Sequence, residues 1–243
     1  MKLTCIGCCG PYPKPNQACT GYLIQNCGSN VVLDLGCGTL SKLLCLLRAD
    51  QIDTLILSHL HSDHMGDALT LRYALEVARK LGRRDVPLPV YLPDTPEKEA
   101  GLLASHPMID ARYISDGMAC LIGGMEARFA LMPHAVPSFA VSLEADGKRM
   151  VYSGDVRDGE RLVPFTSGAD LLLMEAALLA QHKTEGAQHV SAAEAGDIAA
   201  QAKVKRLIIT HIFPEYDESA ILKEVREGFP EAELAYEFGT YEV

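Results

Sequence analysis

The spacing of hydrophobic residues predicts strands and helices along most of the chain. Three short apolar runs near the N-terminus favour strands, at residues 3–8, 21–25 and 31–35. Residues 39–49 have the three- and four-residue apolar spacing of a helix, and so do residues 68–81. Between these two helices, the apolar and β-branched run 54–58 predicts a buried strand.

The rest of the chain continues this pattern. A strand near Val90 and a helix over 96–105 precede an antiparallel β-meander over 114–145. Beyond the meander, strands and helices alternate, with strands at 149–153, 171–174 and 206–210 and helices at 192–201 and 218–228. These elements predict an α/β fold in which two β-sheets pack together with helices outside. Nothing in the pattern requires a domain boundary, so we expect residues 1–243 to form one domain.

Composition and charge disfavour some classes of function. The chain is 48% hydrophobic and 22% charged, as expected of a soluble globular protein. Its formal net charge of −10 argues against a broad nucleic-acid-binding surface, although Arg83-Arg84 is a small basic cluster. No apolar stretch has the length of a transmembrane helix, and no signal-peptide region is visible at the N-terminus. We therefore expect a cytoplasmic protein without membrane contact.

Seven of the eight cysteines lie within the first 45 residues. Because the chain is neither small nor visibly exported, a disulfide framework is not expected. The segment Cys5-x-x-Cys8-Cys9 with Cys19 could hold a structural zinc ion, but no second CxxC pair follows at zinc-ribbon spacing. The favoured interpretation is that the thiols are reduced and buried and pack as small hydrophobic groups.

Residues typical of metal sites are concentrated in the segment His59-Leu60-His61-Ser62-Asp63-His64, directly after the predicted strand 54–58. Neutral imidazole and carboxylate suit zinc, and also iron or manganese. Side chains two residues apart on an extended backbone share a face. His59 and His61 can therefore reach one metal, while the turning chain offers Asp63 and His64 to a second. A solvated surface loop is the alternative, and a cluster of four such residues argues against it.

Three further candidate ligands, His134, Asp155 and His211, each close a predicted strand. Strand ends are where a rigid scaffold presents site residues to a cleft. Taken singly, such a residue is more often a hydrogen-bonded structural one. All three repeat the sequence context of the first cluster, however, so we predict that they belong to the same site.

The order HxHxDH, His, Asp, His resembles the pattern of the metallo-β-lactamase superfamily over nearly the full chain. The resemblance implies a four-layer αββα sandwich with a two-metal site at one edge. The implied ligand set has two halves and a bridge: His59, His61 and His134 for one metal, Asp63, His64 and His211 for the other, and Asp155 between them. The implied cofactors are two divalent ions, zinc first, with manganese or iron as alternatives.

A two-metal site of this kind is suited to hydrolysis. Two cations about 3.5–4 Å apart can share a hydroxide, because the pKa of bound water falls to about 7, and can stabilise developing negative charge. Asp155 would limit the repulsion between the cations. Asp63 could also accept a hydrogen bond from the attacking water and orient it. We therefore predict a hydrolase in which Asp63 is both a ligand and a catalytic residue.

Two segments resemble the phosphodiesterase branch of the superfamily, which contains ribonuclease Z. One is the run 168–176, whose predicted strand leads to Glu175, and the other is the run 188–196, in which His189 precedes a helix. The resemblance implies that Glu175 orients His189, which acts as a general acid or contacts the scissile phosphate. A solvated strand end and a polar residue flanking a helix are the alternative interpretations. β-Lactamases themselves carry a cysteine at the position of Asp155, which disfavours antibiotic hydrolysis.

The chain departs from ribonuclease Z in one respect. Members that grip tRNA usually carry a long basic arm, whereas only 20 residues separate His134 from Asp155 here. Together with the net charge of −10, this argues against tRNA binding. We expect a small-molecule or short single-stranded phosphodiester as substrate, and similar proteins are commonly homodimers. The alternatives are a carboxylic ester, lactone or thioester hydrolase and, in another class, a non-catalytic metal-binding regulatory protein.

Overall fold

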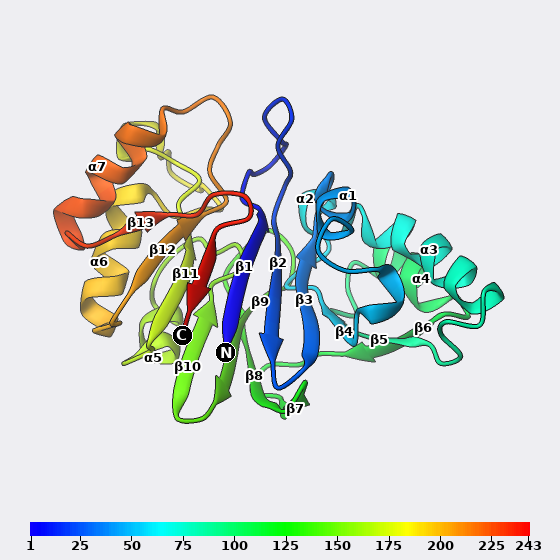
Figure 1. The fold of residues 1–243 in the computed structure, drawn as a ribbon. Coiled ribbons are helices and arrows are strands. Elements are labelled where there is room, and N and C mark those ends of the chain that lie inside the picture. The colour runs from blue at the N-terminus through cyan, green and yellow to red at the C-terminus, as the bar shows by residue number, and fades with distance from the viewer.

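The apolar runs of the sequence form two seven-stranded sheets that face each other in the computed structural model, which describes residues 1–243 (Figure 1). The first sheet has the order β14 (Thr240–Glu242), β1 (Lys2–Gly7), β2 (Gly21–Asn26), β3 (Ser29–Leu35), β4 (Thr54–Ile56), β5 (Leu88–Leu92) and β6 (Ile109–Tyr113). The second has the order β13 (Glu233–Leu234), β12 (Leu207–Thr210), β11 (Leu171–Glu175), β10 (Lys148–Tyr152), β9 (Ser138–Ala145), β8 (Met125–Met132) and β7 (Ala119–Ile122).

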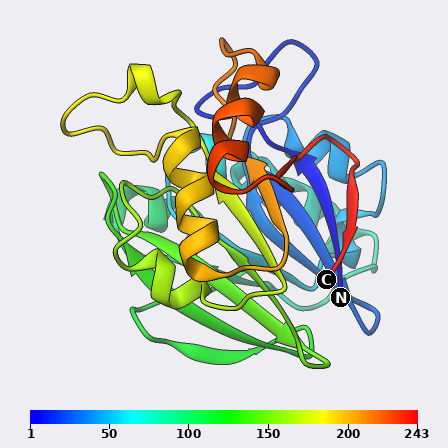
Figure 2. The same cartoon turned by 90° about the vertical axis from the view of Figure 1, so that its left-hand side faces the viewer.

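Helices cover the outer face of each sheet. Those on the first sheet are α1 (Thr39–Leu43), α2 (Ser62–Met65), α3 (Ala68–Lys80) and α4 (Glu97–Ala104), with the short 3-10 helix η1 (Ala49–Gln51). Those on the second are α5 (Leu162–Thr166), α6 (Ala192–Ala202) and α7 (Glu218–Gly228), and η2 (Ala180–His182) lies in the loop before α6. Figure 2 shows α6 and α7 in front of the second sheet. None of the helices combines the length and the apolar character that crossing a bilayer requires.

Three hydrophobic cores hold these four layers together. The core between the sheets contains 24 buried residues, including Tyr22, Phe129 and Tyr152. The cores between each sheet and its helices contain 23 residues each, so both faces of both sheets are covered. The predicted αββα sandwich is therefore confirmed.

The direction of the strands decides where a site can form. Strands β3 to β6 are mutually parallel, and so are β10 to β13. Strand β9 is antiparallel to both β8 and β10, so β8 runs in the same direction as β10. The carboxyl ends of β4, β8, β10, β11 and β12 consequently meet at one edge of the sandwich, at the top of Figure 1.

The structure confirms most of the predicted elements and corrects one. The predicted meander over 114–145 is the antiparallel set β7, β8 and β9. The helix predicted over 39–49 is wrong beyond Leu43, because Cys45 N–H and Leu46 N–H bond to the third preceding carbonyl and tighten the chain into turns. Leu44, part of the apolar stripe that suggested the helix, is exposed.

The inter-sheet core generates a stability prediction. Phe129 is 1% exposed on β8 and stacks on Tyr91, with ring centroids 6.2 Å apart. We expect Phe129→Ala to lower the free energy of unfolding by about 3–5 kcal/mol in urea denaturation, because it leaves a cavity between the sheets. The matched control is Leu121→Ala on the adjacent strand β7, where the side chain is 76% exposed and the expected loss is below about 0.5 kcal/mol. Similar losses for the two variants would contradict the assignment of the core.

Candidate metal centre

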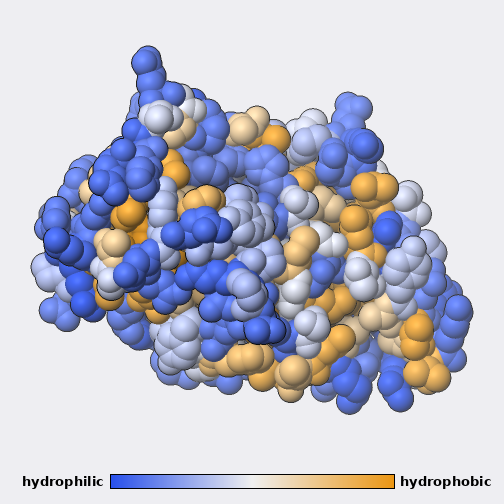
Figure 3. Space-filling view, turned by 90° about the horizontal axis from the view of Figure 1, so that it is seen from above, coloured by the Kyte–Doolittle hydropathy of each residue, from blue (hydrophilic) through white to orange (hydrophobic).

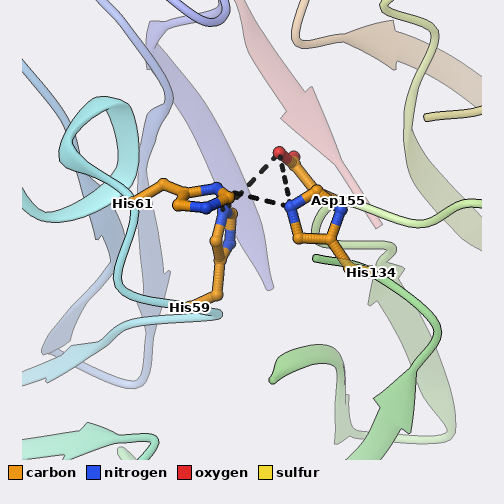
Figure 4. A group of neighbouring side chains, drawn as sticks. All are labelled: His59, His61, His134 and Asp155. Atoms are coloured by element: carbon orange, nitrogen blue, oxygen red, sulfur yellow. Dashed lines mark hydrogen bonds and ion pairs between the residues drawn. The ribbon is translucent and has the colours of Figure 1, made fainter. Parts of the chain in front are cut away.

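Four of the predicted ligand residues converge at the edge where the strands end. His59 and His61 follow β4, His134 follows β8, and Asp155 follows β10. Figure 4 shows their side chains pointing toward a common centre. His61 Nδ1 lies 3.0 Å from His59 Nε2 and 3.3 Å from His134 Nε2. A tetrahedral zinc ion with bonds of about 2.0–2.1 Å separates its nitrogen ligands by roughly 3.3 Å, so this spacing fits a metal.

A second group, formed by Asp63, His64 and His211, lies beside the first. His211 Nε2 is 3.1 Å from Asp63 Oδ2, and His64 Nε2 is 3.5 Å from the same oxygen. Asp155 reaches this group as well, with Oδ1 at 3.3 Å from His64 Nε2 and Oδ2 at 3.5 Å from His211 Nε2. The structure thus brings all seven predicted ligand residues together, with Asp155 within reach of both groups.

The state of the buried polar atoms fits a bound cation. His64 Nε2 and Asp155 Oδ1 are buried and face each other at 3.3 Å without forming a hydrogen bond, an arrangement that is costly unless another group compensates it. Burial lowers the pKa of His59 and of His134, and so favours the neutral imidazole that binds metals. Burial opposes a charge on His64, but the neighbouring carboxylates, Asp155 first, outweigh this effect and raise the pKa of His64. The negative charge around His64 is therefore sufficient to stabilise a buried cation.

The local backbone explains how one short segment serves both groups. His61 is extended, with φ −70° and ψ 150°, and is the N-cap of α2. The chain then makes a single helical turn, closed by the bond from His64 N–H to His61 C=O at 3.0 Å. The extended part directs His59 and His61 to the first group, and the turn directs Asp63 and His64 to the second.

Two glycines allow close packing against the second group. A Cβ atom on Gly10 would lie 2.1 Å from His211 Nε2, and one on Gly36 would lie 1.8 Å from the carbonyl oxygen of Asp63. Gly10 is held there by main-chain pairing, because its N–H donates to Ile212 C=O at 3.2 Å. Any larger residue at either position would displace a candidate ligand.

Asp34, at the end of β3, is a residue that the sequence reasoning missed. It is fully buried, and its carboxylate accepts hydrogen bonds from Ser58 N–H at 2.7 Å and from Tyr152 OH at 2.8 Å. Asp34 Oδ2 also lies 2.8 Å from His64 Nδ1, which fixes the tautomer that leaves Nε2 free to face the site. The available signal was a carboxylate inside the apolar run 31–35, which the periodicity identified only as a strand.

The predicted pair of Glu175 and His189 is present beside the two groups. His189 Nδ1 lies 3.0 Å from Glu175 Oε2, and the buried carboxylate of Glu175 is anchored by Val156 N–H at 2.6 Å. His189 stacks on His211, with ring centroids 5.3 Å apart. Burial opposes a charge on His189, but Glu175 outweighs it and raises the pKa of His189 to about 9. His189 also forms, with Asp155 and His211, a third group of side chains close enough to share a metal ion.

The cysteines take no part in this arrangement. None belongs to a group of side chains that could hold a metal, and all eight are free thiols. The prediction that they are buried is correct for Cys5, Cys8, Cys9 and Cys19 and wrong for the exposed Cys27, Cys37 and Cys45.

Comparison with known proteins agrees with this geometry. The β-lactamase superfamily domain matches residues 29–212. The chain is 31% identical to the probable metallo-hydrolase YhfI of Bacillus subtilis over 212 residues, which cover 87% of each sequence. The crystal structure of YhfI superposes with a TM-score of 0.95 at 30% identity, covering 100% of this chain and 99% of that one. A ribonuclease Z of Brevibacillus brevis is 25% identical in a gapped alignment of 302 positions, which covers 96% of this chain and 93% of the relative.

The position of Asp155 between the two groups generates a prediction about metal content. We expect Asp155→Ala to lower the divalent metal content of the purified protein, measured by elemental analysis, because both groups lose a shared oxygen ligand. The matched control is Asp116→Ala, which removes an exposed carboxylate that pairs with Arg161. Wild-type metal content in Asp155→Ala would show that this residue does not join the groups.

The hydrogen bonds of Asp34 generate a second prediction. Asp34→Asn keeps the shape of the side chain but no longer offers a carboxylate to His64 Nδ1. We expect metal affinity, measured by competition with a chromophoric chelator, to fall about 10–100-fold. Tyr152→Phe is the control, since it removes one donor to Asp34 and leaves His64 paired, and its effect should be smaller. Equal affinities of Asp34→Asn and wild type would rule out this role.

Proposed function

The chain belongs to the β-lactamase superfamily of metallo-hydrolases, and on that premise we propose that it is a phosphodiesterase that acts on a small or single-stranded substrate. The observation that carries the proposal is the pair of Glu175 and His189 beside the two candidate metal groups. We further propose that two divalent ions, zinc first, occupy these groups. A cytoplasmic location and a homodimeric state are proposals of the same kind.

The residues around the site would have different roles in phosphodiester hydrolysis. His59, His61 and His134 would hold one ion and Asp63, His64 and His211 the other, with Asp155 shared between them. When bound, such ions activate water and stabilise charge on the phosphate oxygens. Asp63 faces the same space and would also accept a hydrogen bond from the attacking water.

His189 would supply a proton to the leaving oxygen. Its Nδ1 is paired with Glu175, so Nε2 is the nitrogen that can donate to a substrate. The side chain of His189 is 25% exposed, whereas Glu175 is fully buried, so the pair is open to substrate only through the imidazole. A raised pKa keeps His189 protonated at neutral pH, as a general acid requires.

A proton donor at this place favours a phosphodiester over a thioester. An alkoxide leaving group is strongly basic and needs a proton as the bond breaks, whereas a thiol has a pKa near 8.5 and leaves readily as the thiolate. The named relative ribonuclease Z from Brevibacillus brevis supports the same branch. Between His134 and Asp155 the chain has only β9, a tight turn and β10, so no arm for a large RNA lies there.

Activity assays test the proposal. We expect the zinc-loaded or manganese-loaded protein to hydrolyse bis(p-nitrophenyl) phosphate faster than a panel of thioesters and lactones. His189→Ala should lower kcat by about 10²–10⁴-fold for phosphodiesters with alkyl leaving groups, and less for p-nitrophenyl esters, whose leaving anion is stable without a proton. His106→Ala is the matched control. His106 Nε2 lies 3.1 Å from Glu76 Oε1, and the pair is not part of the site.

The same assays contain the result that would exclude a phosphodiesterase. Thioester or lactone turnover that exceeds phosphodiester turnover and survives His189→Ala would instead assign the chain to the ester hydrolases of this superfamily. Bound metal without turnover on any of these substrates would favour a regulatory protein.

A further inference from the structure

A hollow of about 330 Å³ opens beside His61, next to α3 and α4 on the flank of the first sheet. Its apolar walls come from Leu60, Met65, Leu69, Pro96 and Leu102. Figure 3, which looks onto this edge of the molecule, shows hydrophobic residues more often over α1 to α4 than over α6 and α7. Because His61 is both a candidate metal ligand and part of the wall, a group bound in this hollow would lie next to the reacting atoms. We refer to this hollow as the apolar groove.

Buried side chains and hydrogen bonds hold the apolar groove in a defined shape. Leu60 and Met65, from the segment that carries the candidate ligands, form a buried floor. The two sides are Leu69 from α3 and Leu102 from α4. Arg72 joins these sides, since its guanidinium donates to the carbonyl oxygens of both leucines. The separation of α3 and α4 is thereby fixed by hydrogen bonds.

The charge of the apolar groove restricts what it can bind. No lysine or arginine is among its lining residues, and its one charged side chain is the carboxylate of Glu99. A second phosphate of an oligonucleotide would meet this carboxylate, while the cation that joins the two sides, Arg72, already donates to two carbonyl oxygens. An uncharged apolar or aromatic group would instead bury surface against the leucines and the methionine.

The position of the general acid identifies which part of the substrate enters. His189 packs against His134 and His211, so the leaving group lies on that side of the metals. The groove begins at His61 and is walled by α3 and α4, which cover the first sheet, whereas Glu175 and the loop that carries His189 belong to the second sheet. We propose that the apolar groove binds the uncharged, apolar or aromatic ester group that stays on the phosphate, and that it selects small diesters carrying such a group. This inference rests on the proposed phosphodiesterase function.

Two substrates with the same leaving group test the inference. Bis(p-nitrophenyl) phosphate retains an aryl group after cleavage, and methyl p-nitrophenyl phosphate retains a methyl group. We expect wild type to show the higher kcat/KM for the aryl diester. Leu69→Asp and Leu102→Asp should lower kcat/KM for the aryl diester about tenfold and leave the methyl diester within about twofold, since a hydrophobic pocket discriminates to this degree. Metal content should stay at the wild-type level.

The control is Val77→Asp, which places the same charge on α3 at an exposed position outside the apolar groove. Leu102 is 42% exposed, so Leu102→Asp should fold even if Leu69→Asp does not. An unchanged ratio of the two substrates in Leu102→Asp, or an equal loss for both, would overturn the groove assignment while the phosphodiesterase function stands. If wild type cleaves neither diester, the proposed function fails and the groove assignment fails with it.

Discussion

The structure is organised by the need to stabilise imidazoles and carboxylates that are taken out of water. His59, His64, Asp155 and His211 are all at most 1% exposed, and burying such groups is costly unless each finds a partner. Asp34 supplies a partner for one nitrogen of His64, but other buried atoms have none within the chain. A cation at the shared carboxylate would compensate them, and the stability of this edge would then depend on metal binding.

Much of this arrangement could be predicted from the sequence because the ligand residues directly follow apolar strand runs. Parallel strands end at one edge, so residues that repeat this context, such as Asp155 after β10 and His211 after β12, meet in space. Asp34 was missed because hydrophobic periodicity reports the burial of a position and not its partner 30 residues away. The end of the helix at Leu43 was missed because apolar spacing does not distinguish a helix from consecutive tight turns.

The two sides of the site differ in chemistry, and the difference comes from the layers that flank it. On one side, the loop before α6 brings His189 to Glu175 at the end of β11, which forms a charged pair at the edge of the second sheet. On the other, α3 and α4 bring leucines, because those helices pack on the first sheet and leave part of their apolar surface at the rim. The same four-layer fold can therefore vary its substrate by changing one flank while the centre stays constant.

The contact between Gly10 and His211 bears on when the centre can form. The two residues are 201 positions apart, and the main chain of Cys8 and Gly10 pairs with Ile212, just after β12. The first ligand group needs only residues 59–155, whereas the second needs both distant parts of the chain to be in place. Closing so long a loop carries an entropy cost that must be met before any ligand geometry exists. During biosynthesis, full metal loading would therefore require that the N-terminal segment has already packed against the chain after β12. A folding intermediate that lacks this contact would have an incomplete second ligand group.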